Sequence, residues 1–304
     1  MNAKQFTLPE DTPPLSLLER RARRQERRDK QRQANAGRAA KMHAARLEFQ
    51  HEAVSLDELP LLNVGCSGWF YWHWRGSFYP QASATKNWFA QYADTFPTVE
   101  LNAPFYSWPT VNAVKQWVRQ AGDHPFVYTV KACELLTHVK KFTRTKTLVK
   151  DFCFIADLLG KHMGCFLFQF PPSFHYTPAR LKNIVSQLDP SRRNVLEFRH
   201  KSWWNSAVYA ALQKCGAIFC SCSAPRLPDE LITTADEVYI RFHGPEKWYR
   251  HDYTEAELAV WARRIDESKC KRAWVYFNND RDAFAIKNAK ALTRQLSAIK
   301  RFQA

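Results

Sequence analysis

Residues 237–244 read EVYIRFHG, a short apolar run that ends with an arginine, a histidine and a glycine. Seven further runs have the same form, because each is mainly apolar and carries a polar or charged residue at or near its C-terminal end. They are LLNVGCSGW (61–69), TVELNAPFY (98–106), FVYTVKA (126–132), GCFLFQFPP (164–172), NVLEFRH (194–200), AIFCSCS (217–223) and RAWVYFNND (272–280). Most intervals between the runs are long enough for a helix. Eight strand–helix units are what a (β/α)8 barrel requires.

The sequence therefore predicts an α/β protein with a TIM-barrel-like (β/α)8 domain at residues 59–304. A basic extension at residues 1–58 precedes it. The chain has 304 residues, of which 45% are hydrophobic, and this is ample for one barrel of about 250 residues. Because this fold collects its chemistry at the C-terminal ends of the strands, we expect the functional site there.

The extension at residues 1–58 differs in composition from the barrel. Within residues 20–46, eleven lysines and arginines stand against two acidic residues, which gives a local net charge of +9. Aromatic residues are absent between Phe6 and Phe49. Such a segment buries no core of its own, so we expect it to be disordered or a lone exposed helix. It is either an arm that lies along nucleic acid or another anionic surface, or a solvated extension without a dedicated partner.

Charge and cysteine content limit the class of protein. The net charge of +16 favours polyanionic partners such as nucleic acid, or anionic substrates, although charge that serves solubility alone is an equal alternative. The 8 cysteines form no CxxC pair and most lie in apolar runs, which is typical of buried thiols in a reducing cytosol. The sequence contains neither a run of 18 apolar residues nor a basic-then-apolar signal pattern. We therefore expect a cytoplasmic protein without a membrane partner.

Side chains alternate across a β-strand, so residues two apart share a face. Applied to the runs, this rule collects polar groups near the C-terminal ends of several strands. A buried unpaired charge is costly, so this convergence indicates a prepared polar site. The alternative is a structural network of ion pairs in the barrel mouth, in which Glu100 and Glu197 pair with Lys131, Arg199 and Arg241. The groups that share a face are Glu100 and Asn102; Thr129 and Lys131; Leu167 and Gln169; Glu197 and Arg199; Tyr239, Arg241 and His243; and Tyr276, Asn278 and Asp280.

Two carboxylates stand on strands that lie roughly across the barrel, Glu100 on the second and Glu197 on the fifth. Facing carboxylates serve as acid and base, or as nucleophile, in glycoside cleavage. They equally hold a divalent metal, with His243, His200 and Asp280 as further ligands. Spacing specifies neither use, because the partners come from distant strands.

Three basic residues share the same end of the barrel: Lys131, Arg199 and Arg241. Their charges favour a phosphate, sulfate or carboxylate group on the ligand. They also argue against a two-metal centre, because the three basic side chains would compete with metal ions for the same carboxylates.

An aromatic segment at residues 69–79 follows the first predicted strand, and three nearby glycines suggest a tight loop over the barrel mouth. Aromatic faces there would stack a sugar or a nucleobase. The alternative is a hydrophobic lid that packs on Phe105, Tyr106 and Trp108.

The barrel sequence resembles the domain-of-unknown-function-72 family, the YecE-like proteins. The resemblance implies a TIM-barrel-like fold and no settled activity. Two departures lie near the predicted site: Cys66 stands where the family pattern has threonine, and Ala103-Pro104 replaces Ser-Thr. The matching stretches run in family order over roughly residues 61–300: NVGCSGWFYWHWRGSFYP (63–80), VELNAPFYSWP (99–109), VKACELLTHVKKF (130–142), FQFPPSF (168–174), EFRHKSWW (197–204), YIRFHG (239–244) and VYFNND (275–280).

We expect an enzyme of the hydrolase or lyase type that acts on an anionic or sugar-containing substrate, with paired carboxylates and with or without a divalent metal. The first alternative is a nucleic-acid-binding protein without catalysis, in which the extension and the barrel mouth hold a strand or a flipped base. The second is a scaffold with a purely structural network. The predicted catalytic residues are Glu100, Glu197 and His243, and the predicted substrate-binding residues are Trp69, Asn102, Tyr106, Lys131, Gln169, Arg199, His200, Arg241, Asn278 and Asp280.

Overall fold

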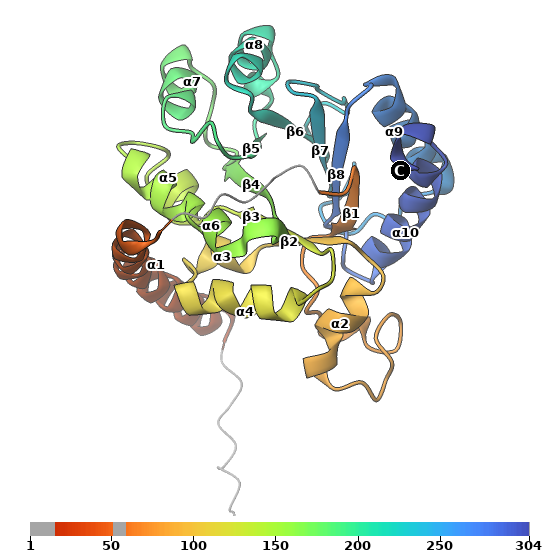
Figure 1. Ribbon diagram of the computed structural model, residues 1–304, viewed down its shortest axis with the longest axis horizontal. Helices are drawn as coiled ribbons and strands as arrows, with labels where there is room; N and C mark the ends of the chain where they lie inside the picture. Colours follow the sequence, from red (N-terminus) through yellow and green to blue (C-terminus); the bar gives the residue numbers. More distant parts are fainter. Residues whose placement is uncertain (1–15, 51–58, 304) are drawn as a thin grey trace, which may run out of the picture.

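A computed structural model describes residues 16–50 and 59–303 and contains a closed barrel of eight parallel strands in the order β1 to β8 (Figure 1). Each strand falls on one of the eight apolar runs, so the predicted (β/α)8 fold is confirmed. The strands are β1 (Leu62–Cys66), β2 (Thr98–Leu101), β3 (Val127–Lys131), β4 (Met163–Phe170), β5 (Asn194–Phe198), β6 (Ile218–Ser223), β7 (Glu237–Phe242) and β8 (Arg272–Phe277).

Helices surround the barrel. Thr110 and Thr254 cap α4 and α9, and Thr254 forms a capping box with Glu257. A 3-10 turn at Thr85–Asn87 precedes α2. Residues 224–236 contain no helix. The helices of the barrel domain are α2 (Trp88–Ala93), α3 (Ala103–Tyr106), α4 (Val111–Ala121), α5 (Lys146–Cys153), α6 (Ile155–Leu159), α7 (Pro178–Val185), α8 (Ser206–Cys215), α9 (Glu255–Glu267) and α10 (Phe284–Ser297).

The basic extension forms one long helix, α1 (Leu17–Glu48), which packs beside α5 on the outside of the barrel (Figure 1). A helix in the basic extension is therefore confirmed, but it docks on the barrel domain instead of standing alone. Asn35 explains the docking, because its amide donates to the carbonyl oxygen of Tyr106 (3.0 Å) and accepts from the N–H of Trp108 (2.9 Å). The docked stripe is spaced three or four residues apart and consists of Arg28, Arg32, Asn35, Ala39, Met42 and Arg46.

Ion pairs complete this contact. Arg28 and Arg32 both donate to Glu134, at 3.0 and 3.1 Å, and Arg46 donates to Asp151 at 2.8 Å. The two carboxylates are buried, so the arginines of α1 neutralise charges that the barrel domain would otherwise bury alone. The rest of the predicted extension, residues 1–15 and 51–58, lies outside the described part of the chain.

The barrel interior is filled by side chains in layers. At the N-terminal end, Trp274 donates to Glu237 (2.7 Å). In the middle, the hydroxyl of Tyr276 lies 2.8 Å from the hydroxyls of both Thr98 and Thr129. These residues alternate with outward-facing ones along each strand, so the two-residue period places the polar groups of the C-terminal layer as predicted.

The first two strands approach unusually closely. A Cβ on Gly65 would lie 2.2 Å from the carbonyl oxygen of Thr98, so only glycine fits there. The hydroxyl of Tyr92 bridges the two strands, because it accepts from the N–H of Cys66 (2.7 Å) and donates to Thr98 (3.0 Å). This contact fixes the ends of β1 and β2, which hold one wall of the barrel mouth.

The burial of the cysteines agrees with the sequence expectation. All eight cysteines are free, and only Cys215 is not fully buried. No helix in the described part of the chain combines the length and apolar character that crossing a membrane requires.

Candidate functional site

Arg241 lies between two carboxylates inside the C-terminal end of the barrel. It donates from Nη2 to Oε1 of Glu100 and from Nη1 to Oε2 of Glu197, each at 2.5 Å. Glu100 also accepts from the hydroxyls of Ser67 (2.7 Å) and Tyr239 (2.6 Å). The two carboxylate side chains are 0% exposed. The three strands β2, β5 and β7 therefore do bring the predicted charged residues together, with a guanidinium between the carboxylates.

Glu197 is held by a second guanidinium, because Arg199 donates from Nε to its other oxygen. Burial opposes ionisation of Glu197, but Arg199 and Arg241 outweigh it and hold the pKa of the carboxyl well below its ordinary value. A carboxylate that stays charged and has both oxygens engaged is poorly suited to take up a proton. This reasoning applies to Glu197. Both oxygens of Glu100 also accept hydrogen bonds, so the arrangement of the two residues favours the ion-pair network over the acid–base pair.

His243, just after β7, is fully buried and contacts Arg199. Its Nε2 lies 3.1 Å from Nη2 of Arg199, and its Nδ1 lies 3.3 Å from the side-chain amide of Asn278. Because a guanidinium only donates, Nε2 accepts from Arg199 and the imidazole is neutral. Burial, together with Arg199 and Arg241, lowers the pKa of His243 well below its ordinary value. His243 therefore orients Arg199 as a neutral ring.

Trp248 covers a third side of Arg199, with its ring centroid 4.4 Å from the guanidinium carbon. The loop after β7 folds back at Gly244, which has φ +99° and where a Cβ would lie 2.6 Å from the carbonyl oxygen of Lys247. Nη1 of Arg199 donates to none of the described residues. The sequence analysis did not predict Trp248. The signal for a chain reversal there was Gly244, which stands two residues after the end of β7.

Lys131, the last residue of β3, points its amine into the same mouth. Its Nζ lies 4.2 Å above the ring of Phe105. Burial lowers the pKa of Lys131 to about 7, with Arg241 and Arg199 acting in the same direction. Lys131 as a whole residue is partly exposed, although protein atoms surround its amine closely.

Asp280 contacts the aromatic segment at residues 69–79 rather than the arginines that pair with Glu100 and Glu197. It accepts from the indole N–H of Trp74 (2.7 Å) and lies 3.0 Å from Nε2 of His73. Burial raises the pKa of Asp280 to about 6, although Trp74 and His73 oppose the shift. Asp280 therefore fastens the aromatic segment to the barrel.

The aromatic segment packs mainly on α2. Tyr79 stacks on Trp88 with centroids 4.6 Å apart, and Trp74 is fully buried. The alternative of a hydrophobic lid named Phe105, Tyr106 and Trp108 as partners, but their ring contacts lie elsewhere: Phe105 contacts Tyr106 and His138, and Trp108 contacts Phe152. Only Phe70 and Trp72 of this segment present large exposed rings.

Five predicted residues remain: Trp69, Asn102, Tyr106, Gln169 and His200. Tyr106 is exposed, with 56% of its surface open. The others engage neighbours: Asn102 donates to the carbonyl oxygen of Ser67 (3.3 Å), Gln169 donates to that of Phe170 (2.9 Å), His200 stacks on His175 (3.9 Å), and Trp69 packs edge-on against Phe89 (5.4 Å).

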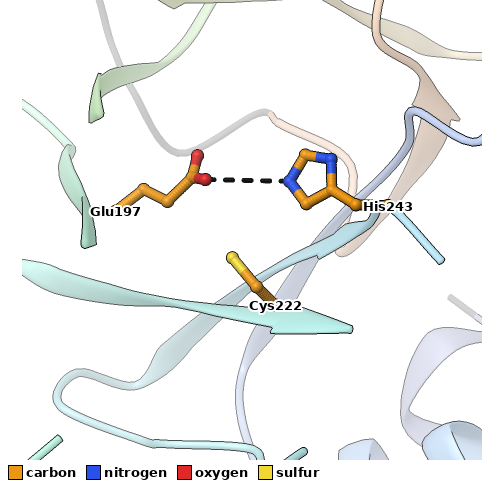
Figure 2. Close-up of side chains that lie close together, drawn as sticks. All are labelled: Glu197, Cys222 and His243. Atoms are coloured by element: carbon orange, nitrogen blue, oxygen red, sulfur yellow. Dashed lines mark ion pairs between the residues drawn. The ribbon is translucent and has the colours of Figure 1, made fainter. Parts of the chain in front are cut away.

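Glu197, Cys222 and His243 have donor atoms that lie within 4.8 Å of one another, as Figure 2 shows. Oxygen, sulfur and nitrogen donors of this kind suit zinc. However, both oxygens of Glu197 already accept from guanidiniums, and Arg199 donates to the His243 nitrogen that faces Glu197. A cation would have to displace Arg199 and sit beside Arg241, so these residues fit a divalent metal poorly.

Comparison with known proteins identifies the barrel. UPF0759 protein YunF from Bacillus subtilis (strain 168) is 26% identical over 275 residues, which are 78% of this chain and 95% of that protein. The crystal structure of a DUF72 family protein from Thermotoga maritima MSB8 has a TM-score of 0.71 and 27% identity, covering 78% of this chain and 99% of that one. A DUF72 family protein from Enterococcus faecalis V583 has a TM-score of 0.66 and 18% identity, covering 78% and 95%.

The names of these relatives state no activity. The family model described as "Protein of unknown function DUF72" matches residues 63–303, which include all eight strands and the charged cluster but not α1. The chain therefore belongs to the DUF72 family.

Proposed function

We propose that the protein is an enzyme of the hydrolase or lyase type whose substrate carries a phosphate, sulfate or carboxylate group. The substrate binds at the C-terminal face of the barrel. This proposal is supported mainly by the contacts of the Arg199 guanidinium. Glu197, His243 and Trp248 hold its guanidinium on three sides, and its remaining nitrogen has no acceptor among the described residues. A preorganised guanidinium of this kind is suited to an oxyanion.

The charge balance of the mouth supports an anionic ligand. Glu100 and Glu197 are matched by Arg241 and Arg199, so these four side chains leave no surplus negative charge that would repel an anion. We assign the two carboxylates and His243 to positioning the arginines rather than to proton transfer, because their donor and acceptor atoms are already engaged. Asn278 contacts the ring nitrogen of His243 that does not face Arg199. The free thiols are typical of a reducing compartment, and we place the protein in the cytoplasm.

A binding experiment tests the anion site. Thermal unfolding is followed with inorganic phosphate, sulfate, glucose 6-phosphate and pyruvate, for wild type and Arg199→Gln. A ligand at about 100 times its Kd adds about 2.7 kcal/mol, which raises Tm by several degrees in wild type. We expect this shift to vanish in Arg199→Gln.

The matched control is Arg264→Gln. Arg264 also lies over a tryptophan, with Trp261 at 4.7 Å, and pairs with Asp229 at 3.1 Å, but it stands on α9 outside the barrel. It should leave the ligand-induced shift unchanged. If no anion stabilises wild type, or if both variants reduce the shift equally, the proposal is wrong.

A second candidate function is nucleic-acid binding through α1. Residues 16–30 are exposed along their whole length and include Arg20, Arg21, Arg23, Arg24 and Arg27. Such a row of charges favours a phosphate backbone. Binding of a short oligonucleotide that weakens steeply with salt, and that is lost when these five arginines become glutamine, would support it; binding that is absent or insensitive to salt would exclude it.

A further inference from the structure

Lys131 is the basic group of the barrel mouth that lacks a counter-charge. Arg241 contacts two carboxylates and Arg199 contacts one, whereas Lys131 makes no ion pair and no hydrogen bond through its amine with any residue in the described ranges. Its nearest recorded partner is the face of Phe105, at 4.2 Å. A buried lysine that serves only as a counter-ion would be expected to touch a carboxylate. This lysine is therefore available for another purpose.

The surroundings of Lys131 favour the uncharged amine. Burial is the main cause of its low pKa of about 7, so roughly half of the molecules carry a neutral amine at neutral pH. His138 adds no positive charge, because burial and the nearby lysine lower its pKa to about 4. The charged groups that face the amine are Arg241 and Arg199, which lower its pKa, and Glu197 and Glu100, which raise it. A lysine that is desolvated and close to other cations is an activated nucleophile.

We propose that Lys131 forms an imine with an aldehyde or ketone whose carboxylate or phosphate group is held by Arg199, and that the reaction is of the lyase type. This inference rests on the proposed function, because Arg199 supplies the anion site that orients the carbonyl carbon. Both side chains come from the inner face of the barrel, on β3 and directly after β5, and both reach the same mouth.

The chemistry balances without an outside oxidant or reductant. The neutral amine adds to the carbonyl carbon, forming a C–N bond. The carbinolamine then loses the carbonyl oxygen and the two amine hydrogens as water, which leaves a C=N bond. Protonation of this imine draws the electron pair of the bond between the adjacent carbon and a hydroxyl-bearing carbon toward nitrogen. That bond breaks, the hydroxyl gives its proton to water, the hydroxyl-bearing fragment departs as an aldehyde, and an enamine remains on Lys131. Protonation of the enamine carbon and hydrolysis by one water return the carbonyl product and the free lysine.

Reductive trapping tests the inference. The full chain is incubated at pH 7 with pyruvate, with dihydroxyacetone phosphate or with neutral acetone, each with sodium cyanoborohydride, and the adducts are located by peptide mass mapping. At pH 7 the neutral fraction of this amine exceeds that of an ordinary lysine by about 1,000-fold, and we expect labelling of Lys131 to exceed every other lysine by at least about tenfold. Acetone, which has no anionic group, should label it much more weakly.

Two variants separate site labelling from surface labelling. Lys131→Met should lose the adduct. Lys290→Met is the matched control, because Lys290 also lies over an aromatic ring, Phe78 at 5.3 Å, but on the exposed side of α10. It should keep the adduct at Lys131. Mapping of the wild-type adduct does not depend on whether either variant folds.

The outcomes distinguish this inference from the proposed function. Adducts spread over surface lysines without excess at Lys131, in a protein that phosphate or pyruvate still stabilises through Arg199, would overturn the imine and leave the anion site intact. Equal labelling of Lys131 by acetone and pyruvate would overturn the role of the anion. Absence of any stabilisation by anions would overturn the proposed function and this inference with it. An excess at Lys131 that depends on the anionic group supports both.

Discussion

Arg241 reaches across the barrel to Glu100, with Nη2 and Oε1 2.5 Å apart and both side chains removed from water. The same guanidinium contacts Glu197, yet its Nε finds no partner among the described residues. An unpaired buried N–H is costly, so the network is not arranged for stability alone. This combination of strong pairing and an unmet donor is typical of a site that has a function.

Arg241→Met is expected to destabilise the fold strongly. It leaves two buried carboxylates without their shared counter-charge, and removal of one partner from a buried ion pair costs about 3–5 kcal/mol. The free energy of unfolding from urea titration measures this. The control is Arg264→Met, which breaks a partly exposed pair with Asp229 and should cost less than about 1 kcal/mol. Similar losses in the two variants would contradict the network.

Lys131→Met is expected to stabilise the protein most at low pH. An unfolded lysine has a pKa of about 10.4, whereas burial lowers the pKa of Lys131 to about 7 in the folded state. Below pH 7 the amine is charged in both states, and the folded state bears the full cost of burying that charge. Between pH 7 and about 10.4 the folded protein releases the proton first, so wild-type stability rises with pH.

The gain from Lys131→Met should therefore be about 1–3 kcal/mol at pH 6 and should shrink toward pH 10. Urea titrations at the two pH values measure it. A loss of stability at pH 6, or a gain that does not change with pH, would show that the amine is not held neutral by its surroundings. Lys290→Met should produce no pH-dependent change, because Lys290 is exposed.

Asp280→Asn is expected to stabilise the protein above pH 6. Burial raises the pKa of Asp280 to about 6, so the folded state binds the proton more tightly than the unfolded state. Wild-type stability then falls as pH rises from about 4 to about 6, and the cost is complete above that range. Asparagine keeps an acceptor for the indole of Trp74 and removes the charge, so we expect a gain of about 1–3 kcal/mol at pH 8 that disappears near pH 4.

The control for this prediction is Asp229→Asn, since the Asp229 side chain is 58% exposed and its partner lies at the surface. It should show no comparable pH dependence. If Asp280→Asn destabilises the protein at pH 8, the contact with His73 outweighs the cost of burying the charge, and the predicted sign is wrong.

Alternation along strands explains how much of the site the sequence reveals. Glu100, Glu197 and Arg241 lie within strands, where residues two apart share a face, and all three lie where that rule puts them. The rule fails once the chain leaves the strand. β8 ends at Phe277, so Asp280 follows the loop and reaches the aromatic segment instead of the charged cluster. His200 likewise lies beyond β5 and stacks on another loop residue.

Contacts that depend on the path of a loop, or on polar side chains between a helix and the barrel, could not be predicted from the sequence pattern. Trp248 reaches Arg199 only because the chain reverses after Gly244, and no periodicity encodes that path. The docking of α1 was missed for a different reason. Its contact stripe holds only two apolar residues, Ala39 and Met42, and depends on Asn35 and on arginines that meet buried carboxylates of the barrel. A prediction from composition would therefore assign this stripe to the solvent-exposed face of the helix.

Gly37→Ala is expected to stabilise the docked helix. Gly37 lies in the interior of α1, and a Cβ there would meet nothing within 4 Å. Alanine restricts the unfolded chain and favours the helix by about 0.5–1 kcal/mol. Hydrogen exchange of the α1 amides should slow by about two- to fivefold, because RT is about 0.6 kcal/mol and the whole gain acts on opening of this helix.

Gly122→Ala is the matched control for that prediction. Gly122 also has nothing within 4 Å of an added Cβ, but it follows α4 with φ +55°, where alanine is strained. The same substitution should therefore destabilise the protein there by about 1–2 kcal/mol. Open space alone would predict the same sign at both glycines, so opposite signs assign the difference to backbone conformation. If Gly37→Ala leaves exchange of the α1 amides unchanged, the docking contacts rather than helix propensity limit the opening of α1.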